Sequence, residues 1–346
     1  MSVRVTVAIP VFNSASTLER AVRSVMRQTV REIEILITDD ASTDGSAAVA
    51  AGLAAEDRRI TVLRSGVNGG KPRAMNRMVA AANGEWIAVL DADDAYREDR
   101  LERLLDAAAG RSVNMIADNI LYVEAGVDAG PDTGVDQVMQ AAFPPGSPAR
   151  SLTRYDLAAH SDSFAAFDFG ILKPVMRRSF LQDNQIRYYE DNRLSEDFYY
   201  LMHFFAAGGT GLLLSEPMYS WTVPFGAVSR QWTQTQTRAG TGTGRYDYRQ
   251  VLRANEYFIG EMRAQGQADM VRMLVARSGQ YRAMISYLDA QRLAFEGGWI
   301  GAASMIARHP ETWRLLTGQI TGRITGRIRR SLVPRPAPST LPTHPT

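Results

Sequence analysis

Short apolar runs alternate with longer amphipathic segments over the first hundred residues of the chain. Apolar runs rich in β-branched residues predict strands at 3–9, 33–37, 60–63 and 86–90. Helical periodicity predicts helices at 16–28, 43–55 and 71–82, and Ser16 with Glu19 predicts a capping box for the first of them. Strands joined by helices imply right-handed crossovers, so the expected fold class is α/β with a mainly parallel sheet flanked by helices.

The alternation weakens after residue 117. Residues 126–150 are rich in Gly, Pro and Asp and predict a long loop. Helices are expected at 175–181 and 196–207, where Gly208 and Gly209 end the second one, and a short strand is expected at 211–214. Helical patterns then recur at 246–263 and 268–295.

These patterns predict a sheet domain followed by smaller parts. The expected divisions are a domain over 1–232, a linker over 233–245, a helical appendage over 246–296 and a basic, Pro-rich tail over 297–346. The tail contains the repeat TGQI-TGRI-TGRI at 317–328. Such a segment is either a basic surface for anionic membranes or a disordered arginine-rich end.

Composition narrows the possible functions. The chain has 39 basic and 37 acidic residues, a balance that gives no support to nucleic-acid binding. It has no cysteine, which excludes disulfides and thiolate sites. No window approaches the roughly 18 apolar residues that span a bilayer, and the N-terminus does not resemble a secretory signal. We therefore expect a cytoplasmic protein, whose tail either contacts the inner face of the plasma membrane or is disordered.

Three carboxylates stand together in VLDADDAY, residues 89–96, directly after a predicted strand. Asp91, Asp93 and Asp94 repel one another unless a cation neutralises them. Mg²⁺ or Mn²⁺ fits, because either ion is held by one or two carboxylates and shares its other positions with substrate phosphates. The alternative is that Asp93 and Asp94 cap a helix beginning near Arg97.

Polar residues follow the other predicted strands as well, and the carboxyl ends of parallel strands form one edge. ITDDASTDGS places Asp39 and Asp40 there, either for a base and ribose or as part of a turn before a helix. VNGGKPRAMN supplies glycines for close backbone approach and Lys71 and Arg73 to face phosphate, or it is a solvated loop. In LSEDFYYLMHFF, Glu196 and Asp197 begin an apolar helix whose dipole favours negative charge.

In this order the motifs resemble those of the inverting glycosyltransferases of family 2, which have the GT-A fold. The resemblance covers about the first 230 residues and extends from VAIPVFNSASTLERAVRSVMRQT through NGEWIAVLDADD and SEDFYYLMHF to EPMYSW. DFGILKPVMRRSFL and SEDFYY also resemble bacterial exopolysaccharide glucosyltransferases of the succinoglycan type.

The resemblance implies a role for each matching residue. Asp39 would contact uracil, Asp91 the ribose, and Asp93 a metal ion that bridges the donor diphosphate, while Asp197 would be the general base. The other expected donor-binding residues are Pro10, Val11, Asn13, Asp40, Gly70, Arg73 and Glu196. Glu190 and Asp191 compete with Asp197 for the role of base, but no strong helix pattern follows them immediately.

The chain departs from the family pattern after the EPMY segment. Many relatives carry a His or Arg there that reaches the metal or the diphosphate, whereas this chain has residues 220–223, Ser-Trp-Thr-Val. Arg230 is the candidate for a phosphate-facing role. His203 lies within an apolar helix pattern and is expected to be a core side chain and not a ligand.

The resemblance implies a metal-dependent transfer of glucose from UDP-glucose to a growing, polyprenyl-diphosphate-linked exopolysaccharide oligosaccharide. One alternative is a sugar-phosphate nucleotidyltransferase, which predicts a Gly- and Arg-rich loop after the first strand; residues 11–16 do not supply one. A second alternative is a non-catalytic protein that binds a sugar nucleotide.

Overall fold

The computed structural model describes residues 2–124, 138–140, 146–159, 172–193, 195–223 and 248–308. The chain forms two compact units, residues 1–277 and 278–346. The predicted linker at 233–245, Arg230 and the repeat at 317–328 lie outside the described residues, so these predictions stay untested.

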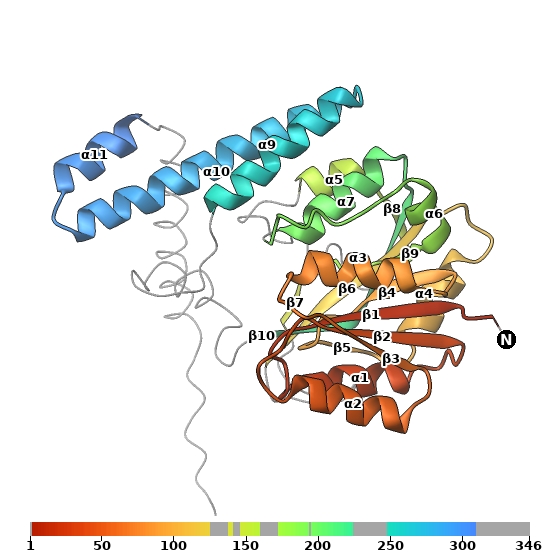
Figure 1. Ribbon diagram of the computed structural model, residues 1–346. Coiled ribbons are helices and arrows are strands. Elements are labelled where there is room, and N and C mark those ends of the chain that lie inside the picture. The colour runs from red at the N-terminus through yellow and green to blue at the C-terminus, as the bar shows by residue number, and fades with distance from the viewer. Residues whose placement is uncertain are drawn as a thin grey trace, which may run out of the picture. The chain divides into compact units, whose positions relative to one another are not determined.

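A ten-stranded mixed sheet forms the centre of the first unit (Figure 1). Its path runs β3-β2-β1-β4-β9-β6-β10-β5, with β7 on β6 and β8 on β10. The strands are β1 (Val5–Val11), β2 (Ile33–Asp39), β3 (Ile60–Arg64), β4 (Trp86–Val89), β5 (Ala95–Tyr96), β6 (Met115–Glu124), β7 (Val138–Gln140), β8 (Arg150–Leu152), β9 (Val175–Arg177) and β10 (Gly211–Val223). Neighbours among β1–β4 pair in parallel, as do β6 and β10, which confirms the expected mainly parallel α/β sheet.

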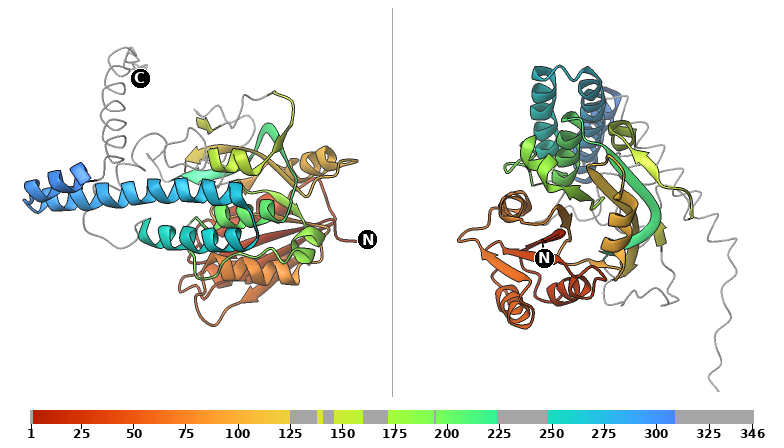
Figure 2. Two further views of the ribbon diagram at one scale, coloured as in Figure 1. Left: turned by 90° about the horizontal axis from the view of Figure 1, so that it is seen from above. Right: turned by 90° about the vertical axis from the view of Figure 1, so that its right-hand side faces the viewer.

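Helices cover both faces of this sheet. The helices of the described residues, in both units, are α1 (Leu18–Met26), α2 (Ser46–Glu56), α3 (Lys71–Ala81), α4 (Arg100–Ala108), α5 (Arg154–Ala159), α6 (Arg178–Asp183), α7 (Glu196–Ala206), α9 (Tyr248–Ala264), α10 (Ala268–Phe295) and α11 (Trp299–Arg308). In Figure 1, α1 and α2 lie on one face of β1–β3, and α3 lies on the other. Figure 2 gives two further views of the same layers.

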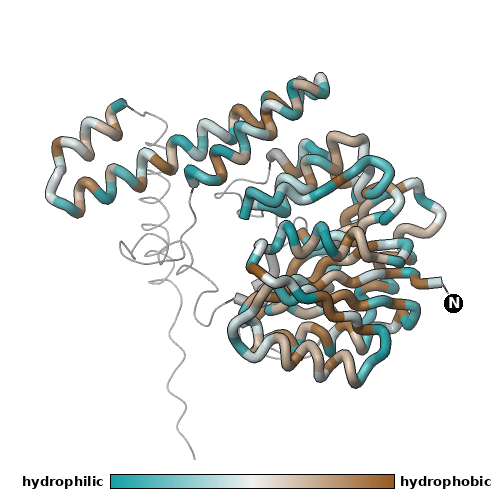
Figure 3. The backbone as a smooth tube through the Cα atoms, in the orientation of Figure 1, coloured by the Kyte–Doolittle hydropathy of each residue, from teal (hydrophilic) through white to brown (hydrophobic). Residues whose placement is uncertain are grey.

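Apolar side chains on both faces of the central strands explain this layering. Val5, Val7, Ala8 and Ile9 of β1 are all fully buried. A parallel strand covered on both faces reads as a continuous apolar run because neither face meets water. Figure 3 shows this hydrophobic centre against more hydrophilic helix surfaces.

The helix predicted at 175–181 is wrong in its first half. Residues 175–177 form β9, which pairs with β4 on one side and β6 on the other. Met176 is aligned with Ile87 and with Met115. Only residues 178–183 are helical, as α6. Pairing on both sides outweighs the local helical preference, because it buries the strand and satisfies its backbone.

The predicted capping box is also wrong. Helix α1 begins at Leu18 with Thr17 at its N-cap, and no side chain caps it. Glu19 instead forms an ion pair with Arg23, one helical turn on, at 2.8 Å.

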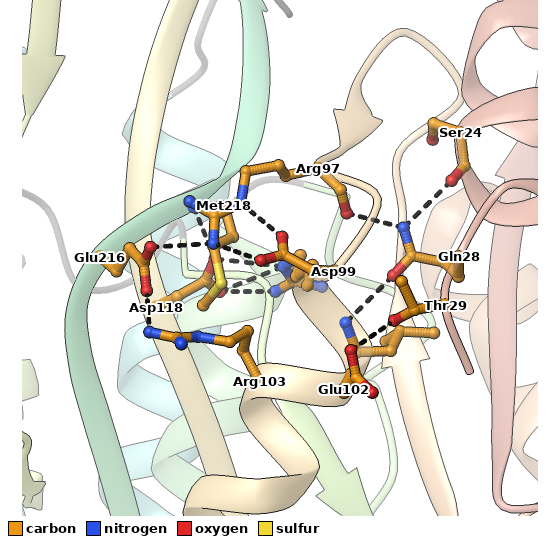
Figure 4. Close-up of polar contacts among 12 residues, drawn as sticks. Ser24, Gln28, Thr29, Arg97, Asp99, Glu102, Arg103, Asp118, Glu216 and Met218 are labelled. Carbon is orange, nitrogen blue, oxygen red and sulfur yellow. Dashed lines mark hydrogen bonds and ion pairs between the residues drawn. The ribbon is translucent and has the colours of Figure 1, made fainter. Parts of the chain in front are cut away.

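A polar network joins the end of α1, the start of α4 and β10 (Figure 4). Gln28 is fully buried, donates through Nε2 to the carbonyl of Arg97 at 2.7 Å, and accepts a bond from the Leu101 N–H at 3.0 Å. Arg97 and Arg103 both pair with Glu216 of β10, at 2.9 and 2.7 Å. These contacts hold the segment that follows Asp91, Asp93 and Asp94 in place against the end of α1 and against β10.

The expected helices near residues 246–263 and 268–295 are confirmed as α9 and α10. Helix α9 packs on α7 within the first unit. The Tyr199 hydroxyl lies 3.2 Å from both the Val251 carbonyl and Asn255 Oδ1, and the Tyr199 ring stacks on Phe258. In the part of the chain that the structure describes, no helix combines the length and apolarity needed to cross a membrane.

The second unit contains residues 278–295 of α10 and the whole of α11. Helix α11 lies in the segment that was expected to be a tail. Three large apolar side chains at the corner between the two helices face solvent: Phe295 is 93% exposed, Trp299 71% and Ile300 88%.

Candidate active site

The strand ends that the sequence marked as polar meet at one edge of the sheet. Val11 is aligned with Asp39, and Asp39 with Arg64, at the carboxyl ends of β1, β2 and β3. The Leu90 N–H donates to the Ala8 carbonyl at 3.1 Å, which brings the end of β4 to the same edge.

Asn13 ties the first two of these loops together. Its N–H donates to Ser42 Oγ at 3.0 Å, and its Oδ1 accepts a bond from the Thr43 N–H at 2.8 Å. Asn13 has a positive φ of 51°, a conformation that asparagine tolerates better than most residues. Pro10 and Val11 are the last two residues of β1 and precede Asn13 in the chain. Pro10 is half-buried and Val11 is buried.

Asp39 and Asp40 have different local partners. The buried Asp39 carboxylate accepts a bond from the Ser42 N–H at 3.1 Å and lies 3.5 Å from Arg64 Nε. Asp40 is also buried, and its two oxygens accept bonds from the N–H groups of Gly69 and Gly70, at 3.0 and 2.6 Å. Asp40 therefore shapes the glycine loop, and its predicted contact with a nucleotide stays a prediction.

A side chain on either glycine of that loop would meet an arginine side chain. A Cβ on Gly69 would lie 2.5 Å from Arg73 Cδ, so the exposed Arg73 side chain crosses the position that a larger residue would fill. Gly70 has a φ of +83°, and a Cβ on it would lie 3.1 Å from Arg193 Nε. The loop thus brings two arginines close to its backbone.

The three carboxylates after β4 occupy three different environments. Asp93 is exposed. Asp94 is fully buried, and its carboxylate accepts bonds from the Tyr219 hydroxyl at 2.6 Å and from the Thr222 N–H at 2.8 Å. Burial and the charge of Asp91 raise the pKa of Asp94 well above its usual value. The predicted capping role is wrong, because α4 begins at Arg100 with Asp99 at its N-cap.

The third carboxylate, Asp91, joins a cluster of four charged groups. Lys71 Nζ lies 2.8 Å from Asp91 Oδ1 and 3.0 Å from Asp197 Oδ2. Lys173 Nζ lies 2.9 Å from Asp91 Oδ2 and 2.5 Å from Asp197 Oδ2. Lys71 had been expected to face phosphate. In this arrangement the two lysines are the counter-ions of Asp91 and Asp197.

Charge in this cluster keeps Asp197 ionised. Burial alone would raise the pKa of Asp197, but Lys173 and Lys71 outweigh it and hold the pKa below its usual value. The neighbouring Glu196 lies 3.8 Å from Lys71, and burial together with Asp197 raises the pKa of Glu196. Asp197 is thus the more acidic of the two adjacent carboxyl groups.

The surroundings also separate Asp197 from its competitors. The Tyr188 hydroxyl donates to Asp197 Oδ1 at 3.3 Å. Glu190 and Asp191 are exposed, and Glu190 accepts a bond from the Asn76 side chain at 3.0 Å. Only Asp197 of these three belongs to the buried cluster with Asp91.

The residues present are compatible with a divalent cation of the type that substrate phosphates complete. Among the described residues, no three His, Asp or Glu side chains form a group that could hold a metal. Asp93 nevertheless offers an exposed carboxylate beside Asp91, and Mg²⁺ needs only one or two carboxylates when a diphosphate supplies the rest. Asp93 would hold the ion, and oxygen donors suit both Mg²⁺ and Mn²⁺.

Lys173, Tyr188 and Tyr219 are the site residues that sequence reasoning missed. Lys173 and Tyr219 contact Asp91 and Asp94 from segments far apart in the chain, and Tyr188 lies nine residues before Asp197 at a spacing that belongs to no motif. For Lys173 the signal was its rarity, since Lys71 is the only other lysine in the sequence. Residues 220–223 form the end of β10 and pair with β5 and β6.

Comparisons with known proteins find similarity to glycosyltransferases. Residues 6–175 match the family model described as glycosyl transferase family 2. The succinoglycan biosynthesis protein ExoO of Rhizobium meliloti (strain 1021) is 32% identical over 230 residues, which cover 65% of this chain and 62% of ExoO. The chain therefore spans about three fifths of that relative.

Solved structures share the fold at low sequence identity. S. aureus TarS 1-349 in complex with UDP superimposes with a TM-score of 0.54 at 18% identity, covering 90% of this chain and 91% of that one. The mannosyltransferase PcManGT from Pyrobaculum calidifontis, in complex with GDP-Man and Mn²⁺, gives a TM-score of 0.51 at 19% identity, covering 92% and 80%. Residues 6–175 thus match glycosyl transferase family 2, and the described residues have the GT-A fold.

Proposed function

We propose that the protein is an inverting glycosyltransferase that moves glucose from UDP-glucose to a lipid-linked exopolysaccharide oligosaccharide, with Mg²⁺ or Mn²⁺ as cofactor. The single observation that carries this proposal is the position of Asp197. Its carboxylate lies beside Asp91, at the strand edge where GT-A proteins place the donor, and two lysines join both groups.

The donor side is built from the first four strand ends. Asp39, at the end of β2, would accept bonds from uracil, and Asp91 would accept them from the ribose. Asn13 holds the two loops that would enclose the base. Arg73 is exposed next to Gly69 and would approach the diphosphate. A nucleotide at this edge follows the general rule for open α/β sheets.

Asp197 would act on the acceptor. A hydroxyl that attacks the anomeric carbon loses its proton as the new bond forms, and the ionised Asp197 would receive that proton at Oδ1 or Oδ2. A positioned carboxylate contributes about 10²- to 10⁴-fold in such a step. Attack from the face opposite to the departing diphosphate inverts the anomeric centre.

The leaving group requires positive charge. A divalent ion held by Asp93 supplies Lewis-acid stabilisation of the departing diphosphate when it is bound. Lys71 lies at the N-terminus of α3, where the helix dipole also favours an anion. Arg73, on the first turn of α3, would add a protein cation on the same side.

The relatives support the substrate class. ExoO is named for succinoglycan biosynthesis, and one structural neighbour carries UDP. A polysaccharide intermediate of this kind on a polyprenyl diphosphate would lie at a membrane surface. The corner formed by Phe295, Trp299 and Ile300 is apolar and exposed, and the sequence beyond it is rich in arginine, which suits an anionic membrane surface.

A panel of nucleotide sugars tests the proposal. Each would be added with Mn²⁺, and thermal unfolding would be followed, because a ligand that binds only the folded chain raises its stability. UDP-glucose is expected to raise the midpoint temperature of unfolding more than GDP-mannose does. When acceptor lipid is added, transfer of glucose should release UDP. Stabilisation without UDP release from any donor would favour the non-catalytic alternative. Pyrophosphate release from UTP and glucose-1-phosphate would favour the nucleotidyltransferase.

A further inference from the structure

Lysine is used at only two positions in this chain. Of 39 basic residues, Lys71 and Lys173 are lysine and all the others are arginine. Arginine is therefore the default cation of the chain, on the surface and in buried pairs such as Arg100–Asp118. Both exceptions lie in the same four-charge cluster, although they come from different elements. Lys71 is the first residue of α3, and Lys173 precedes β9.

The geometry of the cluster explains the exceptions. Each ammonium lies within 3.0 Å of an oxygen of Asp91 and of an oxygen of Asp197, so each bridges two carboxylates from different elements. An ammonium is compact and directs three donors to separate acceptors. A guanidinium is planar, wider, and best suited to pairing side by side with one carboxylate.

The surroundings of Lys173 reinforce this requirement. Its side chain is only 9% exposed. A small pocket beside it is lined mainly by apolar groups, including Val89, Leu172 and Pro174. These apolar groups offer no side-chain acceptor for the additional N–H groups of a guanidinium, and the acceptors in the same lining are the hydroxyls of Tyr188 and Tyr200 and the carboxylate of Asp197, which Lys173 already contacts. The backbone is also held in place, because Arg100 Nη2 donates to the Lys173 carbonyl at 2.6 Å.

We propose that Lys71 and Lys173 are positioning residues that must be lysine: their ammonium groups fix the donor-side Asp91 and the base Asp197 at one separation, and arginine cannot replace them. The assignment of Asp197 as the base rests on the proposed function. The bridging itself rests on the contacts alone. A lysine that served only to stabilise the fold would be replaceable by any change that restored folding.

The absence of cysteine allows a direct test. In K173C the new thiol is unique, so alkylation of the unfolded chain with 2-bromoethylamine followed by refolding restores an ammonium at nearly the length of lysine. Alkylation with iodoacetamide gives a neutral side chain of similar size. K173R keeps the charge but changes its shape, and K173M removes the charge while leaving an unbranched side chain one atom shorter than lysine. R177M is the matched control, because Arg177 lies on β9 and pairs with Glu85 at 2.7 Å outside the cluster.

UDP release from UDP-glucose, with Mn²⁺ and acceptor lipid, is the first measurement. We expect K173R and K173M to release UDP about 100-fold more slowly than wild type, or slower still, which is the scale of a misplaced catalytic group. R177M should release UDP at a rate near that of wild type. Aminoethylated K173C should regain most of the rate, and the iodoacetamide product should not. Wild-type activity in K173R, or equal rates for the two alkylated products, would overturn the requirement for lysine.

The pH profile separates positioning from general stability. Loss of one cation beside Asp197 should move the acid limb of UDP release upward in K173M by about one pH unit or more, since an opposite charge at this distance lowers a carboxyl pKa by that order. An unchanged acid limb in a folded, slower K173M would contradict the role in holding Asp197. If K173M fails to fold, K71M gives the same comparison from a side chain that is 21% exposed.

A double-mutant cycle tests the bridge without any substrate. K173M and D197N should each lower the free energy of unfolding measured in urea. The double variant should lower it by less than the sum of the two single losses, because the two side chains contact each other. Strict additivity would show that the bridge does not exist in solution. If wild type releases UDP from no donor, the proposed function fails, and this cycle still decides whether the lysines join the two carboxylates.

Discussion

Arg100 and Asp118 form an ion pair closed off from solvent, with side chains 0% and 1% exposed and Arg100 Nη2 2.7 Å from Asp118 Oδ1. The same guanidinium nitrogen donates to the Lys173 carbonyl, and Asp118 Oδ2 accepts a bond from the Met218 N–H at 3.1 Å. One buried pair therefore connects α4, β6, β10 and the segment that carries Lys173.

Removal of the Arg100 charge should be strongly destabilising. R100M leaves Asp118 buried without a counter-ion, a change that typically costs about 3–5 kcal/mol. R103M is the matched control on the same helix, because Arg103 pairs with Glu216 at the surface, where such pairs contribute about 0–1 kcal/mol. Urea unfolding measures both variants. Similar losses in the two would show that burial does not decide the strength of the pair.

Asp197 should be needed for turnover and not for donor binding. D197N keeps the shape of the side chain but cannot receive the acceptor proton, so we expect the transfer rate to fall by about 10²- to 10⁴-fold. Calorimetry should find UDP–Mn²⁺ affinity within a few-fold of wild type. E190Q and D191N are the controls, since both residues are exposed. Normal turnover in D197N would move the base to another group.

Asp93 should couple nucleotide binding to the metal. We expect D93N to lose the part of UDP affinity that Mn²⁺ adds in wild type, because one carboxylate fewer faces the ion and the diphosphate. Titrations with and without Mn²⁺ measure this difference. D106N on α4 removes a carboxylate elsewhere and should retain the full metal effect. An identical metal effect in D93N would exclude Asp93 as a ligand.

Acid should weaken the fold partly through the lysine-bridged cluster. The pKa values of Asp91 and Asp197 are held low, because Lys173 and Lys71 outweigh burial. A carboxyl group with a lowered folded-state pKa stabilises the fold fully above its unfolded pKa, about 3.9 for Asp, and this contribution is lost as the pH falls through the folded-state value. D197N should therefore show a shallower fall of the urea midpoint below about pH 5 than wild type. A wild-type slope in D197N would contradict the role of this cluster.

The apolar corner of the second unit should contribute to membrane contact. W299S/I300S removes two exposed apolar side chains beside Phe295, and we expect weaker binding to vesicles of phosphatidylcholine with phosphatidylglycerol. Deletion of 317–346 should weaken binding further and reduce its sensitivity to salt, since that segment is rich in arginine. Val275 is also exposed, so V275S serves as the control in a sedimentation assay. Unchanged partitioning of both altered chains would exclude this surface.

The alternation of strands and helices was predictable because it depends on local periodicity. β1 to β4 with α1 to α3 account for the convergence of Asn13, Asp39, Gly70 and Asp91 at one edge. β9 was not predictable, because three residues are too few to show a period and their pairing with β4 and β6 is not local.

The sequence also did not reveal which groups are the counter-ions of the clustered carboxylates. Clustered carboxylates correctly indicated a need for positive charge, and a metal was inferred from chemistry alone. The two lysines were visible in the sequence, but their approach to Asp91 depends on how α3 and the segment before β9 are placed by the sheet. Tyr219 contacts Asp94 across a separation of 125 residues, which no motif spacing could indicate.

The hydroxyl of Tyr219 accepts a hydrogen bond from the Asp91 N–H and donates one to the Asp94 carboxylate. Strand β10, which carries Tyr219, is therefore synthesised well after the carboxylate motif whose hydrogen bonds it completes. A nascent chain that ends at residue 175 has every residue matched by the family model but has neither Asp197 nor Tyr219. Under the proposed function, the base Asp197 would be made only after this matched segment, and the hydrogen bonds of Asp91 and Asp94 with Tyr219 would form only after synthesis of β10.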